Sequence, residues 1–102
     1  MAIVDSLPEL SDTILRDIEK GVDILKSEGC KSIYIFGSVA EGHVTDRSDI
    51  DFAVRGCPPD KFYNLQGKLL LELTRVTDLI DLDSDADLAS FLEREATLIH
   101  VG

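Results

Sequence analysis

Two aspartates with one residue between them, Asp49 and Asp51, follow a Gly-Ser pair at a spacing of ten residues in the stretch GSVAEGHVTDRSDIDFAV. A glycine at the position of Gly37 allows the backbone to turn sharply at the end of an apolar run and lets a ligand approach closely. A serine that opens a short helical turn, as Ser38 is expected to do, presents an N–H group and a hydroxyl to an anion such as a phosphate. The pair therefore predicts a phosphate-binding turn.

The two aspartates predict a metal site beside that turn. On a strand, residues two apart project from the same face, so Asp49 and Asp51 would lie together. Carboxylates held that close repel each other unless a cation sits between them, and oxygen ligands next to a phosphate suit Mg²⁺ or Mn²⁺. This is the layout for metal-assisted transfer of a phosphoryl or nucleotidyl group.

The elements that must position these residues follow from hydrophobic periodicity and turn residues. An amphipathic helix is predicted over residues 7–28, with Ser6 and Glu9 as a capping box and Gly29 after its end. Further helices are predicted over residues 58–74 and 84–96, the second with Ser84 or Asp85 as its cap. Strands are predicted over residues 31–36, 49–55, 76–83 and 97–101.

This order of elements gives a single α/β (α+β) domain over residues 1–102, with a small mixed sheet covered by helices. The sequence contains no repeat, linker or low-complexity segment. Two cysteines, Cys30 and Cys57, are too few for a disulfide framework, so we expect both to be reduced.

The composition limits the partners of such a domain. Twenty acidic and ten basic residues give a formal net charge of −10. Direct nucleic-acid binding is therefore disfavoured, and a polyphosphate would need a metal ion or a nest of N–H groups. No apolar run approaches the roughly 20 residues of a membrane helix, and the segment MAIVDSLPEL lacks the features of a signal peptide. We expect a cytoplasmic protein that does not bind membranes.

The stretch GSVAEGHVTDRSDIDFAV resembles the G-S-x₁₀-D-x-D signature of the minimal nucleotidyltransferases, within the polymerase-beta-like nucleotidyltransferase superfamily. The resemblance implies that Gly37 and Ser38 hold a nucleoside triphosphate such as ATP, and that Asp49 and Asp51 bind Mg²⁺ or Mn²⁺. It also implies a third carboxylate on a downstream strand, which joins the metal site and activates the attacking hydroxyl.

Two aspartates of TDLIDL, Asp78 and Asp81, are candidates for that third carboxylate. They are three residues apart and so leave opposite faces of a strand, which means that only one can join the other pair. Alternation alone leaves the choice open. The family pattern favours Asp78.

The sequence departs from the family at two positions. The common sequence of this motif in the family is GSRARG, whereas this chain has Val39 and Glu41 in place of the two arginines. We expect weaker nucleotide binding as a result.

The family resemblance implies an enzyme that transfers AMP or another nucleoside monophosphate to a tyrosine of a helical HEPN-type toxin and so acts as its antitoxin. The alternative is a module that silences such a partner by contact alone, with catalysis weak or lost.

Overall fold

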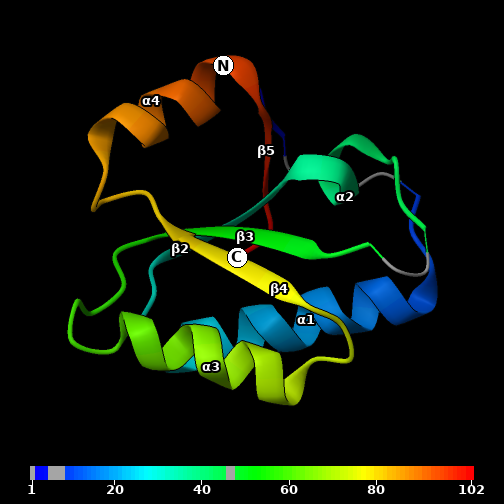
Figure 1. The fold of residues 1–102 in the computed structure, drawn as a ribbon, viewed down its shortest axis with the longest axis horizontal. Coiled ribbons are helices and arrows are strands. Elements are labelled where there is room, and N and C mark those ends of the chain that lie inside the picture. Colours follow the sequence, from blue (N-terminus) through cyan, green and yellow to red (C-terminus); the bar gives the residue numbers. More distant parts are fainter. Residues whose placement is uncertain (1, 5–8, 46–47) are drawn as a thin grey trace.

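The computed structural model describes residues 2–4, 9–45 and 48–102. These residues form a five-stranded sheet with four helices, in the order β1, α1, β2, α2, β3, α3, β4, α4, β5 (Figure 1). The strands are β1 (Ala2–Val4), β2 (Ser32–Phe36), β3 (Ile50–Arg55), β4 (Thr77–Asp81) and β5 (Thr97–His100). The helices are α1 (Asp12–Ser27), α2 (Gly37–Glu41), α3 (Phe62–Glu72) and α4 (Ala86–Glu95).

The sheet is mixed, as predicted, with the strand order β1-β5-β2-β3-β4. Strand β2 lies antiparallel to β3 on one side and to β5 on the other, whereas β3 and β4 are parallel, as are β1 and β5. Because parallel neighbours need a crossover, helix α3 connects β3 to β4. Strand β4 is thus an edge of the sheet.

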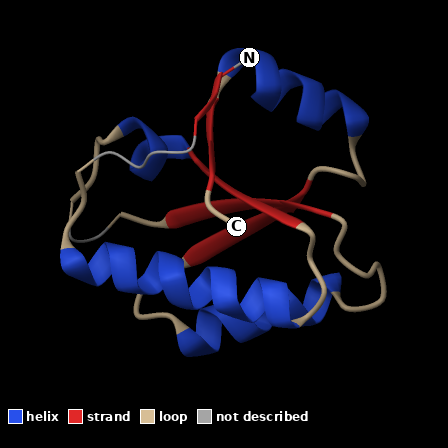
Figure 2. Ribbon diagram, turned by 180° about the vertical axis from the view of Figure 1, so that it is seen from behind, coloured by secondary structure: helices blue, strands red, loops and turns tan. Residues whose placement is uncertain are grey.

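Helices cover both faces of the sheet (Figures 1 and 2). Helices α1 and α3 lie side by side against one face, where alternate residues of β3 such as Ile50, Phe52 and Val54 enter the main core. Helix α4 packs on the opposite face, over Ala53 and the smaller cluster around it. The alternation of β3 therefore sends its intervening residue Asp51 to the face that α4 only partly covers.

The observed helix limits differ from the predicted ones at their starts. Helix α1 begins at Asp12, because the Ser11 hydroxyl caps it by accepting the N–H of Ile14. The predicted start at residue 7 is wrong, because Leu10 extends the apolar spacing of the helix toward the N-terminus but is not itself helical. The expected cap at Ser6 lies outside the described residues. Gly29, with φ of 104°, follows the helix end as predicted.

The cysteine prediction is also wrong. Cys30 and Cys57 form a disulfide, at the ends of β2 and β3 remote from the Gly-Ser turn. The β2–β3 register pairs Ser32 with Arg55, so its continuation brings the two cysteines opposite each other. This pairing depends on strand register, which the number of cysteines does not reveal. In the described part of the chain, no helix has the length and apolar character that crossing a membrane requires.

Candidate active site

Asp51 and Asp78 lie next to each other on adjacent parallel strands. They are direct Cα partners in the β3–β4 register, so their side chains leave the same face of the sheet. Asp51 is half-buried and Asp78 is exposed. Two carboxylates that are far apart in the sequence thus meet at one end of the parallel pair.

The electrostatic setting of Asp51 reflects this proximity. Four causes together raise the pKa of its carboxyl from 3.8 to about 6: burial has the largest effect, followed by the charge of Asp78, a hydrogen bond with Asp78 and the charge of Asp49. Above pH 6 the group is therefore ionised against the opposition of its neighbours. A nearby cation would relieve this repulsion.

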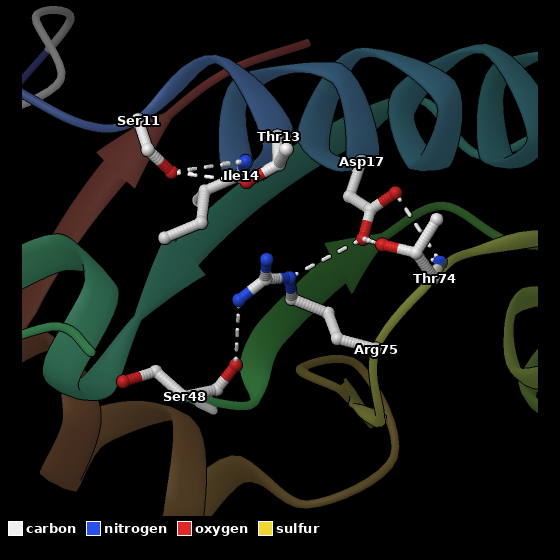
Figure 3. A network of polar contacts seen from close by, with 7 residues as sticks. All are labelled: Ser11, Thr13, Ile14, Asp17, Ser48, Thr74 and Arg75. Atoms are coloured by element: carbon white, nitrogen blue, oxygen red, sulfur yellow. Dashed lines mark hydrogen bonds and ion pairs between the residues drawn. The ribbon is translucent and has the colours of Figure 1, made fainter. Parts of the chain in front are cut away.

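Asp49 is exposed and lies just before the first residue of β3. This segment is bonded to a polar network around the buried Asp17, which Figure 3 shows from close by. Arg75 donates through a terminal guanidinium N–H to the carbonyl of Ser48, at 3.3 Å, and its Nε donates to the Asp17 carboxylate, also at 3.3 Å. Asp17 is 4% exposed and also accepts hydrogen bonds from Thr74. Helix α1 is thereby linked to the residue that precedes Asp49.

The Gly-Ser turn lies directly against Asp51. The last residue of β2, Phe36, is the Cα partner of Asp51, and α2 begins at the next residue, Gly37. Gly37 has φ of 73°, and a Cβ at this position would overlap the Oδ2 atom of Asp51. Only glycine fits here, because both the backbone conformation and the space exclude a side chain. Ser38, at the second position of α2, is half-buried.

The two positions that depart from the family pattern have different surroundings. Val39 is 0% exposed and belongs to the main core, whereas Glu41 is exposed at the end of α2. The side chain at position 39 therefore points away from solvent. Of the two departures, Glu41 alone presents a charge that a ligand at the surface would meet.

The geometry separates the two candidates for the third carboxylate. Asp78 is opposite Asp51, while Asp81 is opposite Val54, at the other end of β4. The Oδ1 atom of Asp81 accepts the N–H of Asp83 at 2.9 Å, within the turn that follows the strand. The structure therefore brings Asp78 beside Asp51 and leaves Asp81 at the far end of β4.

Two polar residues that support the site were not singled out from the sequence. Asp17 lies on the apolar face of α1, with Ile14 and Ile18. An acidic residue on the apolar face of a predicted helix could have indicated a buried polar contact. Gln66 of α3 bonds to the backbone of β4 through its amide. Its position beside Leu65 gave no signal, since a glutamine at the margin of an apolar face is ordinary.

In the described ranges, no three His, Cys, Asp or Glu side chains are gathered closely enough to hold a metal ion by themselves. The charges of Asp78 and Asp49 nevertheless both contribute to the raised pKa of Asp51. Asp51 and Asp78 together form a two-carboxylate site. A third set of oxygen ligands would have to come from a bound molecule.

Solved structures resemble this fold. A mutant of the MntA–HepT toxin–antitoxin complex contains a chain that is 26% identical, with a TM-score of 0.63; the match covers 92% of this chain and 75% of that one. A toxin–antitoxin structure with AMP-PNP gives 26% identity and a TM-score of 0.63, over 86% of this chain and 72% of that one. A further MntA–HepT structure, at 24% identity and a TM-score of 0.59, agrees in fold over 82% and 69% of the two chains.

Among proteins with curated functions, none matches this chain in sequence. The family model described as "Polymerase beta, Nucleotidyltransferase" matches residues 19–101, which include the Gly-Ser turn and the aspartates Asp49, Asp51, Asp78 and Asp81. The chain belongs to the polymerase beta nucleotidyltransferase family.

Proposed function

We propose that this protein transfers AMP from ATP to a tyrosine hydroxyl of a HEPN-type toxin and thereby acts as the antitoxin. The observation that carries the proposal is the position of Asp51, which lies between Asp78 on the neighbouring strand and the Gly37 turn at the end of β2. A phosphate held at that turn would lie beside both carboxylates. This is the arrangement that nucleotidyl transfer needs.

The similar structures support the choice of substrate and partner. One of them is a toxin–antitoxin structure with AMP-PNP, an analogue of ATP, and others are MntA–HepT complexes. The net charge of −10 disfavours a nucleic-acid acceptor and suits a protein partner with a basic surface. A hydroxyl presented by such a partner would complete the site.

The residues present fit a divalent metal ion. Mg²⁺ is usually bound by one or two carboxylates together with substrate phosphate oxygens rather than by a complete protein cage. Asp51 and Asp78 would supply two carboxylates, and the nucleotide would supply the remaining oxygens. Asp49, whose charge acts on Asp51 from the adjoining segment, would join them only once a metal ion is bound. A bound Mg²⁺ or Mn²⁺ would supply charge neutralisation of the triphosphate.

The chain's own groups account for the remaining chemistry. The N–H groups and hydroxyl of the Gly37–Ser38 turn would hold the triphosphate, with its α-phosphorus facing the carboxylates. Asp78 would accept the proton of the attacking hydroxyl. The acceptor oxygen then bonds to the α-phosphorus, the bond from that phosphorus to the β-phosphate oxygen breaks, and pyrophosphate leaves.

A second function has one observation in its favour. Glu41 is exposed at the end of α2, where its charge would oppose a triphosphate at the Gly37 turn. If this repulsion prevents nucleotide binding, the protein would silence its partner by contact alone.

Incubation with labelled ATP, Mg²⁺ and a HEPN-type protein encoded beside this chain tests the two functions. Transfer should place AMP on the partner, and the label should disappear when Ser38→Ala is combined with Asp51→Asn. A matched control combines Ser90→Ala on α4 with Asp23→Asn on α1, which makes the same chemical changes at exposed positions. A partner that is silenced without label, with either metal and each of the four nucleotides, would leave the contact-only function.

The role of Asp78 has its own test. Asp78→Asn should preserve nucleotide binding and lower transfer by roughly two to four orders of magnitude, because the proton acceptor is lost. Asp81→Asn is the control, since asparagine keeps an oxygen that accepts the Asp83 N–H. The opposite result would assign the role to Asp81.

A further inference from the structure

The outer edge of β4 bears backbone groups that a further strand would normally satisfy. Strand β4 is the last of the described sheet, and β3 lies on its inner side. In a parallel ladder, the residue opposite Asp78 on an outer strand would donate to the carbonyl of Thr77 and accept the N–H of Leu79. These two groups flank Asp78 in the chain.

The side chain of Gln66 makes both of these bonds. Its Nε2 donates to the Thr77 carbonyl at 2.7 Å, and its Oε1 accepts the N–H of Leu79 at 3.2 Å. The orientation of the amide follows from its partners, because only the nitrogen can donate and only the oxygen can accept. One side chain thus takes the place of the absent strand residue opposite Asp78.

Helix α3 fixes Gln66 in this position. Its neighbours Leu65 and Leu69 are buried in the main core, so the helix cannot shift relative to the sheet without loss of packing. The amide is therefore held by the same crossover that makes β3 and β4 parallel. The amide contacts backbone groups of β4, so changes to the side chains of that strand would leave both of its hydrogen-bonding partners in place.

We propose that Gln66 is the positioning residue for Asp78: it clamps the peptide groups on both sides of that aspartate and so fixes where the carboxylate points. This inference rests on the proposed function, in which Asp78 acts on the acceptor hydroxyl. Without these two bonds, β4 would be held at this point by its pairing with β3 and by its buried side chains alone. A small twist of the strand would then carry the Asp78 carboxylate away from Asp51. Displacement of a reacting group by about 1 Å lowers transfer by around 100-fold.

Gln66→Met tests the proposal, because methionine has a similar length and forms neither bond. We expect kcat for AMP transfer to the HEPN-type partner to fall about 10- to 100-fold, while KM for ATP with Mg²⁺ changes less than about threefold. Asn64→Leu, which removes an exposed amide from the same helix, is the matched control and should leave both constants unchanged. Exchange of the Leu79 amide hydrogen should become faster in Gln66→Met alone.

A double-mutant cycle distinguishes positioning from a general loss of structure. In an Asp78→Asn background, Gln66→Met should lower the residual transfer less than twofold, since the group it positions is already gone. An undiminished effect in that background, or full transfer by Gln66→Met, would overturn the inference. If Gln66→Met does not fold, Gln66→Asn serves instead, since its amide is one methylene too short to reach both groups.

Different results would contradict the proposed function and this inference. A wild-type protein that transfers no AMP contradicts the function, whereas active wild type and equally active Gln66→Met contradict only the role of Gln66. Exchange of the Leu79 amide that is equal in both proteins would show that the clamp itself is absent in solution, and that result would also overturn the inference.

Discussion

Replacement of Asp51 by asparagine should stabilise the protein at neutral pH. The pKa of Asp51 is raised from 3.8 to about 6, so the folded protein holds the ionised carboxylate against burial and two like charges. A shift of roughly two units corresponds to about 3 kcal/mol in the free energy of unfolding. Because the group is partly open to solvent, we discount this by half and expect a gain of about 1.5 kcal/mol.

The sign of the pH dependence follows from the direction of the shift. Because the pKa of Asp51 is higher in the folded state, its carboxyl contributes stability that is fully present below pH 3.8, the pKa in the unfolded state. This stability is lost as the pH rises through about 6, where the folded wild type must release the proton. Asparagine is neutral throughout. The gain in Asp51→Asn should therefore be complete above about pH 7 and should shrink to about a fifth near pH 4.

Urea unfolding of both proteins between pH 4 and pH 8 measures this difference. Asp23→Asn, which removes one charge from the exposed face of α1, controls for the change in net charge and should give no comparable pH-dependent gain. A gain for Asp51→Asn that does not vary with pH, or a loss of stability at pH 7.5, would refute the account of Asp51 given above.

Three further predictions concern the surroundings of the site. Gly37→Ala should lower the free energy of unfolding by about 1–3 kcal/mol in urea titrations, because φ is positive and a Cβ would overlap the Asp51 carboxylate. Gly67→Ala, in open space on α3, should instead raise it by up to about 1 kcal/mol. Glu41→Arg reverses an exposed charge and should tighten binding of AMP-PNP with Mg²⁺ about 3- to 10-fold, as measured by calorimetry. Val39→Arg buries a charge in the core and should prevent folding, as measured by circular dichroism. Asp17→Ala should cost about 3–5 kcal/mol in chemical unfolding, since it leaves the Arg75 guanidinium, whose side chain is only 11% exposed, without its carboxylate.

Local sequence patterns predicted most of the elements of this fold. The faces of α1 and α3 and the strands around the Gly-Ser turn follow from periodicity, which depends only on neighbouring residues. The start of α1 was wrong because apolar spacing continued past a capping residue, Ser11, that periodicity ignores. Helix caps and helix periodicity are separate signals, and here they disagreed.

Several features that local sequence patterns did not predict depend on strand register. The disulfide needs Cys30 opposite Cys57, and the choice between Asp78 and Asp81 needs the alignment of β4 with β3. Register is set by contacts between distant segments, so no local pattern contains it. The clamp by Gln66 was missed for the same reason, because its partners are backbone groups on a strand that follows the helix.

The parallel pairing of β3 and β4 has a consequence for the order in which the molecule folds. Strands β2 and β3 are antiparallel neighbours in the chain, whereas Asp51 and Asp78 lie on strands that the α3 crossover separates. We expect this repulsive contact to form late, after the rate-limiting barrier. Stopped-flow measurements should then show the stabilisation in Asp51→Asn as slower unfolding, with little change in the folding rate. The site would thus limit the lifetime of the native state while leaving the route to it unaffected.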